Sequence, residues 1–170
     1  MRVGGAAVLL LAPALAAPGC SRRESTRQGD TAAQAPASGG GPASRVVITG
    51  SVNKTYTPSE VSAVKIADAV GISLYEEFPC GVSVTFPLAL QPGTCPIEDI
   101  LNLAGTVKVF ARYGEVCAED ERHYASTSGK LVLTASGKSF SGSFEFAAGH
   151  VRDKSKTIHV SGSFRNASRP

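Results

Sequence analysis

Cysteine is the residue type in this 170-residue chain with the widest choice of chemistry. A thiol can take up lipid, form a disulfide, bind a metal ion or act as a nucleophile. The four cysteines are Cys20, Cys80, Cys95 and Cys117. No two of them have the C-x-x-C spacing of thiol redox motifs and zinc sites. Their surroundings must therefore decide between lipidation, disulfide bonding and a free thiol.

The other reactive side chains form no catalytic motif. The sequence has no G-x-S-x-G, no H-E-x-x-H and no glycine-rich phosphate loop. Glu76 and Glu77 are consecutive, and neighbours in a strand point to opposite faces, which argues against joint acid–base chemistry. We expect the three scattered histidines to be solvated surface residues: His123, His150 and His159. We therefore assign no catalytic, cofactor-binding or metal-ligating residue.

Two further patterns admit a functional interpretation beside a simpler one. The acidic run from Glu115 to Glu121 holds four carboxylates near Cys117, and such oxygen ligands suit a weak Ca²⁺ site, although a solvated loop is the simpler explanation and the one we expect. Ser139, Ser141 and Ser143 form a hydroxyl row that would hydrate an exposed sheet face. The enzyme hypothesis that stays open is a small hydrolase or thiol-dependent enzyme, with Cys95 or a serine beside a histidine.

The first twenty residues have the pattern of a signal peptide. Arg2 supplies a positive charge, and Val8 to Leu15 is an apolar run too short for the roughly 20 residues of a membrane-spanning helix. The small residues from Ala16 to Gly19 then precede Cys20. This arrangement resembles the lipobox of bacterial lipoproteins, which implies that Cys20 is lipidated and becomes the new N-terminus.

The lipobox resemblance also implies a location. Several acyl chains on Cys20 would suffice for stable anchoring. Ser21, by similarity to enterobacterial lipoproteins, favours the outer membrane of the cell envelope. Two alternatives remain: cleavage after Ala16, which would release a secreted or periplasmic protein, and Cys20 as an incidental thiol.

Residues 21–44 differ in composition from the rest of the chain. This segment is rich in Ser, Gly, Pro, Ala and Gln and has no large apolar residue. It cannot bury enough surface to offset the entropy of ordering, so we expect a disordered linker. As a flexible chain it would span roughly 25–30 Å.

From Arg45 onward, apolar residues recur at every second position, which is typical of half-buried strands. The clearest pair shares the tetrad Ser-Gly-Ser-Phe, at 141–144 and 161–164, and we expect two neighbouring antiparallel strands. The tetrad glycines lie on the apolar face, where a bulge or a bulky cross-strand neighbour would explain them. The sequence predicts a mainly β domain over 45–170: an antiparallel sandwich or small barrel of about eight strands.

Three segments of this domain are less regular. Residues 94–105 have Pro96 at a suitable first helical position and Gly105 at a suitable stop, which predicts one short helix. Thr57 to Glu60 spells a helix capping box, but the β-leaning residues that follow favour a hairpin. The tail from Asn166 to Pro170 has no pattern and is expected to fray.

Several short motifs of the domain resemble a loose family of small uncharacterised envelope lipoproteins of bacteria with GC-rich genomes. The motifs are Gly50-Ser51-Val52, Tyr56-Thr57-Pro58, Phe78-Pro79-Cys80, Ser128 to Thr134 and Phe140 to Phe144. The resemblance implies a β fold and an envelope location, and it implies no activity.

If Cys20 carries lipid, three cysteines remain, and an oxidising compartment would join two of them. A strand predicted over 82–90 separates Cys80 from Cys95, so these two cannot easily meet. If the strand that follows Cys80 and the strand that precedes Cys117 pair antiparallel, the two cysteines lie at the same end of that strand pair. We therefore expect a Cys80–Cys117 disulfide with Cys95 as the spare thiol, either reactive at a helix start or, more simply, buried and inert.

Charge and aromatic content restrict the partners. Four of the 17 basic and two of the 14 acidic residues precede residue 45, which leaves 13 and 12 in the domain. A nucleic-acid partner is not expected from so balanced a charge. The absence of Trp and the few aromatics weigh against sugar and peptide platforms. We expect a non-enzymatic structural or binding module, with the membrane as a partner through its lipid and another envelope protein as a second candidate partner.

Overall fold

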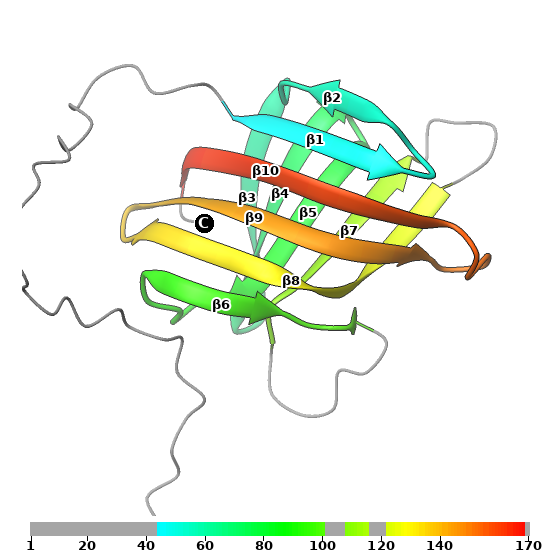
Figure 1. Cartoon of the computed structure of the whole chain (residues 1–170). Coiled ribbons are helices and arrows are strands. Elements are labelled where there is room, and N and C mark those ends of the chain that lie inside the picture. The colour runs from blue at the N-terminus through cyan, green and yellow to red at the C-terminus, as the bar shows by residue number, and fades with distance from the viewer. Residues whose placement is uncertain (1–43, 101–107, 116–121, 169–170) are drawn as a thin grey trace, which may run out of the picture.

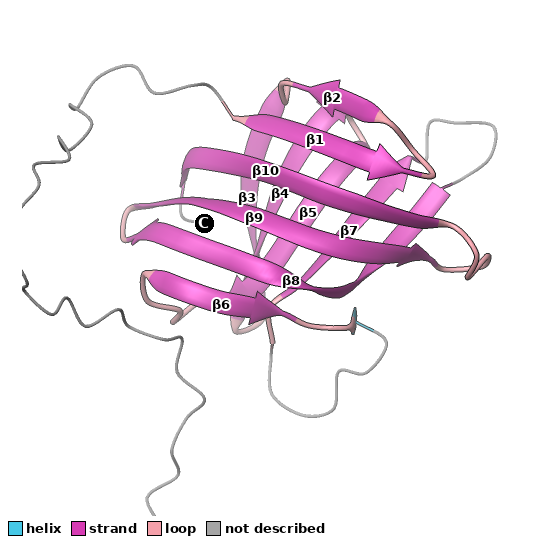
Figure 2. Ribbon diagram, viewed as in Figure 1, coloured by secondary structure: helices cyan, strands magenta, loops and turns pink. Residues whose placement is uncertain are grey.

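A computed structural model describes residues 44–100, 108–115 and 122–168, and over these ranges the protein is mainly β and antiparallel, as predicted (Figures 1 and 2). The described part has ten strands rather than about eight. They are β1 (Arg45–Gly50), β2 (Lys54–Tyr56), β3 (Glu60–Ile66), β4 (Ala69–Glu77), β5 (Cys80–Pro87), β6 (Gly93–Ile97), β7 (Phe110–Glu115), β8 (Arg122–Ser136), β9 (Ser139–His150) and β10 (Thr157–Ser168). The signal peptide predicted over Met1 to Cys20 and nearly all of the predicted linker lie outside the described residues.

The strands form one curled sheet. Their order is β2-β1-β10-β9-β8-β7-β5-β4-β3, and β6 pairs with β8 beside this path. Figure 1 shows the curl as a half-barrel, with β1, β10, β9 and β8 in front and β3, β4, β5 and β7 behind. The long strand β8 joins the two halves, because its first residues pair with β7 and its later residues pair with β6.

The core lies on the concave side of this sheet. Alternate residues of each strand point inward, as the period-two pattern predicts, and the buried set is almost wholly apolar. Phe86 of β5 and Phe140 of β9 meet edge to face with ring centroids 5.5 Å apart. Since β5 and β9 are not neighbours in the sheet, this contact packs the two halves against each other.

The two Ser-Gly-Ser-Phe tetrads pair with each other, as predicted. In the β9–β10 register, Gly142 lies opposite Phe164 and Gly162 lies opposite Phe144. A Cβ on Gly162 would lie 2.5 Å from Phe144 Cζ, and one on Gly142 would lie 3.0 Å from Phe164 Cζ. Each glycine therefore makes room for the phenylalanine of the other tetrad.

The short helix predicted over residues 94–105 is wrong at its start. Gly93–Ile97 is strand β6, in which Cys95 and Ile97 are buried and Thr94 and Pro96 are exposed. Alternating burial thus outweighed the helix-start signal of Pro96. Proline is tolerated here because, among the strands that the structure describes, β6 pairs with β8 alone and is an edge strand. Residues 101–107 lie outside the described range.

The ambiguous segment after Thr57 is a hairpin, as favoured. β3 and β4 pair continuously from Glu60 opposite Tyr75 to Ile66 opposite Ala69. The tail prediction is wrong, because β10 runs to Ser168 and buries Ala167. A bulge between Phe164 and Ala167 places Asn166 at φ 51°, a left-handed conformation that asparagine tolerates.

Within the described ranges, no helix has the length and apolar character needed to cross a membrane.

Candidate functional site

The cysteines were the first candidates for chemistry. Cys80 and Cys95 are each disulfide-bonded, so neither of the cysteines in the described ranges is a free thiol. The expectation that Cys95 is the spare thiol is therefore wrong, and its sulfur cannot serve as a nucleophile. Cys20 and Cys117 lie outside the described residues, so lipidation of Cys20 and the Cys80–Cys117 pairing stay predictions.

The other sequence candidates do not converge on one site. His159 is exposed on the outer face of β10, and His150 Nδ1 accepts hydrogen bonds from the N–H groups of Arg152 and Asp153. Joint chemistry of Glu76 and Glu77 is not expected from the sequence, and Glu76 pairs with Lys54. In the acidic run, residues 116–121 lie outside the described ranges, and Glu115 is largely buried.

The densest group of titratable side chains in the described ranges lies at one end of the half-barrel. Lys54 Nζ of β2 lies 2.5 Å from Glu76 Oε2 of β4 and 3.3 Å from Glu115 Oε1 of β7. Arg122 Nη1 of β8 lies 3.3 Å from Glu115 Oε2, and Tyr113 Oη donates a hydrogen bond to Glu115 Oε1. We call these five residues the end cluster.

Three groups of the end cluster, Lys54, Glu115 and Tyr113, are held in their usual charge states by their neighbours. The hydrogen bond to Glu76 raises the pKa of Lys54, against the opposing effect of burial. Burial alone would raise the pKa of Glu115, but the hydrogen bonds from Tyr113 and Lys54 and the nearby positive charges outweigh it and lower this pKa. Burial raises the pKa of Tyr113, which stays a neutral donor. A poised acid–base pair would instead need pKa values near neutrality, so the end cluster is best explained as structural.

Sequence reasoning missed most of the end cluster, although one signal for it exists. Glu115 continues along β7 the inward phase of Ala111 and Tyr113, which begins at Val109 just before the strand. A carboxylate in an inward position predicts a buried partner. The identity of the partner Lys54 depends on the curl that brings β2 to β4, which local sequence does not encode.

A second candidate site is a hollow on the outer face of the sheet. Four residues form one row across β4, β5, β7 and β8, because Tyr75 lies opposite Gly81, Gly81 opposite Gly114, and Gly114 opposite His123. The two adjacent glycines leave a gap between two rings. The hollow has a volume of about 220 Å³.

Polar side chains line one side of the hollow and an aromatic pair lies at its rim. Ser73, Ser83 and Arg112 form the next outward-facing row, and all three line the hollow. Arg112 Nε donates to Ser83 Oγ at 3.1 Å. Tyr75 meets Phe78 edge to face at 5.2 Å, and the Phe78 side chain is 72% exposed. This arrangement can hold a small polar ligand with an apolar face.

The chain matches no protein-family model, and no curated protein or solved structure matches it either. The likeness to small envelope lipoproteins therefore rests on the short motifs alone.

Proposed function

We propose that this protein is a lipid-anchored lipoprotein of the bacterial cell envelope, whose β domain is a non-enzymatic binding module. The observation that carries the proposal is the order of segments along the chain. A signal-like segment ends in small residues and Cys20, a polar segment of about 25 residues follows, and the first strand begins at Arg45. Such an order is what a domain held clear of a lipid surface requires.

The proposed location is the outer membrane, from Ser21 after Cys20, with a secreted or periplasmic protein as the alternative. The membrane is the first partner, through the lipid, and a second envelope protein is another. A thiol-dependent enzyme loses support because the sulfur of Cys95 is disulfide-bonded. A binding role gains support from the hollow between Tyr75 and His123.

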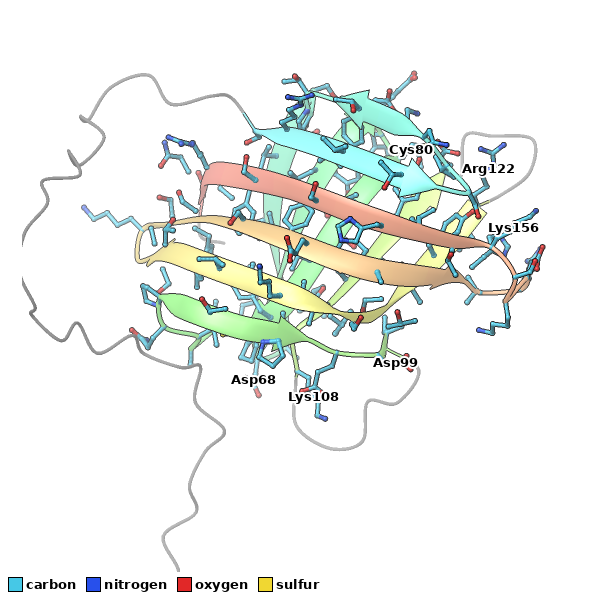
Figure 3. The ribbon with its side chains drawn as sticks, viewed as in Figure 1. Asp68, Cys80, Asp99, Lys108, Arg122 and Lys156 are labelled. Carbon is cyan, nitrogen blue, oxygen red and sulfur yellow. The ribbon has the colours of Figure 1, made fainter. Side chains whose placement is uncertain are left out.

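We also propose the Cys80–Cys117 disulfide, for the secreted alternative in which Cys20 carries no lipid. Because Cys95 is disulfide-bonded as well, this pairing leaves Cys20 as its partner within the chain, and a sulfur in a disulfide cannot carry an acyl chain. β5 and β7 pair antiparallel, with Gly81 opposite Gly114, which brings the start of β5 beside the end of β7. Cys80 and Arg122 lie at this same end of the molecule, away from Asp68 and Lys108 (Figure 3). Cys117 is two residues beyond the end of β7, within reach of Cys80. On the chain-entropy account such a crosslink stabilises by roughly 4 kcal/mol.

The test is membrane fractionation and intact mass of the protein expressed in a Gram-negative host, beside the Cys20→Ala variant. We expect the wild type in the membrane fraction with added acyl mass on Cys20. We expect the Cys20→Ala variant outside the membrane fraction and without acyl mass. Soluble wild-type protein that begins at Ala17 would contradict the lipid anchor and indicate secretion. A non-reducing peptide map of the same sample tests the pairing of Cys80.

A further inference from the structure

We propose that the outer hollow binds a single sugar ring that carries a carboxylate. This inference deepens the proposed binding role, and it does not depend on the lipid anchor. The floor of the hollow is backbone, because Gly81 and Gly114 stand side by side. Tyr75 and His123 stand at its two ends, with their backbones three strand spacings or roughly 14 Å apart.

The charge in the hollow selects an anion. Arg112 has no carboxylate partner among the described residues, and its Nε–H is directed to Ser83 Oγ at 3.1 Å. That bond fixes the plane of the guanidinium and leaves its remaining N–H groups for a ligand. A guanidinium donates two parallel hydrogen bonds to a carboxylate, which orients the ligand as well as attracting it.

The remaining lining selects a polyhydroxylated ring. Ser73 and Ser83 offer hydroxyls, and Tyr75 offers aromatic surface within the lining. The exposed Phe78 does not line the hollow itself but packs edge to face on Tyr75 beside it. An aromatic side chain covers the apolar face of a sugar while the hydroxyls bond its edge. The chain has few aromatics overall, yet the β4–β5 turn gathers two of them at this one rim.

The size of the hollow limits the ligand to one ring. Its volume of about 220 Å³ lies below the roughly 300–1,000 Å³ of sites for drug-sized ligands. A ligand larger than one sugar would have to extend past Phe78 into solvent. A single acidic sugar unit, free or at the end of a polymer, therefore fits the shape, charge and lining.

The experiment is isothermal titration of the full exported chain, wild type and Cys20→Ala, with glucuronate, glucose and inorganic phosphate. We expect glucuronate to bind both proteins at millimolar or lower concentration, and glucose at least tenfold more weakly. Arg112→Gln should weaken glucuronate binding at least tenfold. Arg165→Gln, an exposed arginine on β10, is the matched control and should not change it.

A second variant tests the floor of the hollow. A Cβ on Gly114 would lie 3.5 Å from His123 Nδ1, an ordinary contact, so Gly114→Ala should fold and weaken binding severalfold. Gly81→Ala is unsuitable, because its Cβ would lie 2.3 Å from the Leu74 carbonyl oxygen. Equal binding of glucose, binding of phosphate alone, no binding, or binding unchanged by Arg112→Gln would each overturn the proposal. Binding lost only in Cys20→Ala would also overturn it, since the hollow is distant in sequence from the anchor.

Discussion

At the scale of single residues, the reciprocal fit of the two tetrads leads to a stability prediction. In Gly162→Ala the new methyl would lie 2.5 Å from Phe144 Cζ and 2.8 Å from the Arg45 carbonyl oxygen. Overpacking of this kind costs about 1–3 kcal/mol. We expect the free energy of unfolding, measured in urea, to fall by that amount.

Gly137→Ala is the matched control for this prediction. Nothing lies within 4 Å of a Cβ at Gly137. Alanine there should leave the free energy of unfolding unchanged or raise it by less than about 1 kcal/mol, because it restricts the unfolded chain. Equal effects of the two substitutions would show that Phe144 does not require a glycine opposite it.

The glycines also show what the sequence can predict at this scale. Gly142 and Gly162 stand in visible period-two patterns, which predicted their place on the apolar face. Of the two explanations that the sequence leaves open, a bulge or a bulky cross-strand neighbour, the structure shows the neighbour. Gly81 and Gly114 form the floor of the hollow only because β5 and β7 pair in one register. The sequence around either residue carries no sign of that register, and the hollow was therefore missed.

At the scale of elements, Lys54 ties β2 to two strands that are not its neighbours in the sheet. Lys54→Met keeps the aliphatic stem but leaves Glu76 and Glu115 without the cation between them. We expect a loss of about 1–2 kcal/mol, between the values typical of exposed and buried ion pairs. Hydrogen exchange should show the largest loss of protection in β2.

Lys130→Met is the control for Lys54→Met. Lys130 pairs with Glu145 across neighbouring strands, and both side chains are about half exposed, 53% and 48%. Breaking such an exposed pair should change stability less than Lys54→Met does and leave the protection of β2 intact. If both variants lose the same stability and β2 stays protected in each, Lys54 does not hold the two strands together.

The sequence predicted an element correctly where one sequence signal dominated. The prediction failed where a helix signal and a strand signal competed. The hairpin of β3 and β4 was predicted because the β-favouring residues of this segment outweigh the helix signal of the capping box. β6 was mistaken for a helix because Pro96 and the acidic residues after it suit a helix start equally well. Alternating burial of Cys95 and Ile97 against β8 decided the outcome, and that contact joins residues more than 30 positions apart.

At the scale of the whole molecule, the end cluster makes stability depend on pH. Its environment lowers the pKa of Glu115 below the ordinary value near 4.5. A carboxyl with a lowered pKa in the folded state contributes stability that is complete above its unfolded pKa. This contribution is lost as the pH falls through the folded value. The difference in unfolding free energy between wild type and Glu115→Gln should be constant above about pH 6 and shrink below pH 4.5.

Glu145→Gln separates this effect from that of an exposed carboxyl. The pKa of Glu145 is also lowered, by its hydrogen bond to Lys130, but its side chain is about half exposed. Added salt should therefore reduce the change in stability caused by Glu145→Gln. It should leave most of the change caused by Glu115→Gln. A wild-type advantage over Glu115→Gln that grows with acid would contradict the assigned direction of the shift.

The mainly β class was predictable for the whole molecule, whereas the curl was not. Period-two patterns fix which residues of each strand point inward, for example Val82, Val84 and Phe86. They do not say which strands are neighbours. The register shift in β8 between Ser126 and Ser128 accompanies its change of partner from β7 to β6, and no local motif marks it.

The position of β1 between β2 and β10 has a consequence for the timing of folding. Val46 and Ile48 stay without their β10 partners until the end of the chain arrives, and Ser51 Oγ accepts from Thr157 N–H across 106 positions. At ribosomal rates of about 5–20 residues per second, this wait lasts roughly 5–20 s. During that time the nascent chain cannot complete its sheet. For the exported protein that we propose, the late arrival of β10 therefore delays the finished sheet until synthesis is nearly complete.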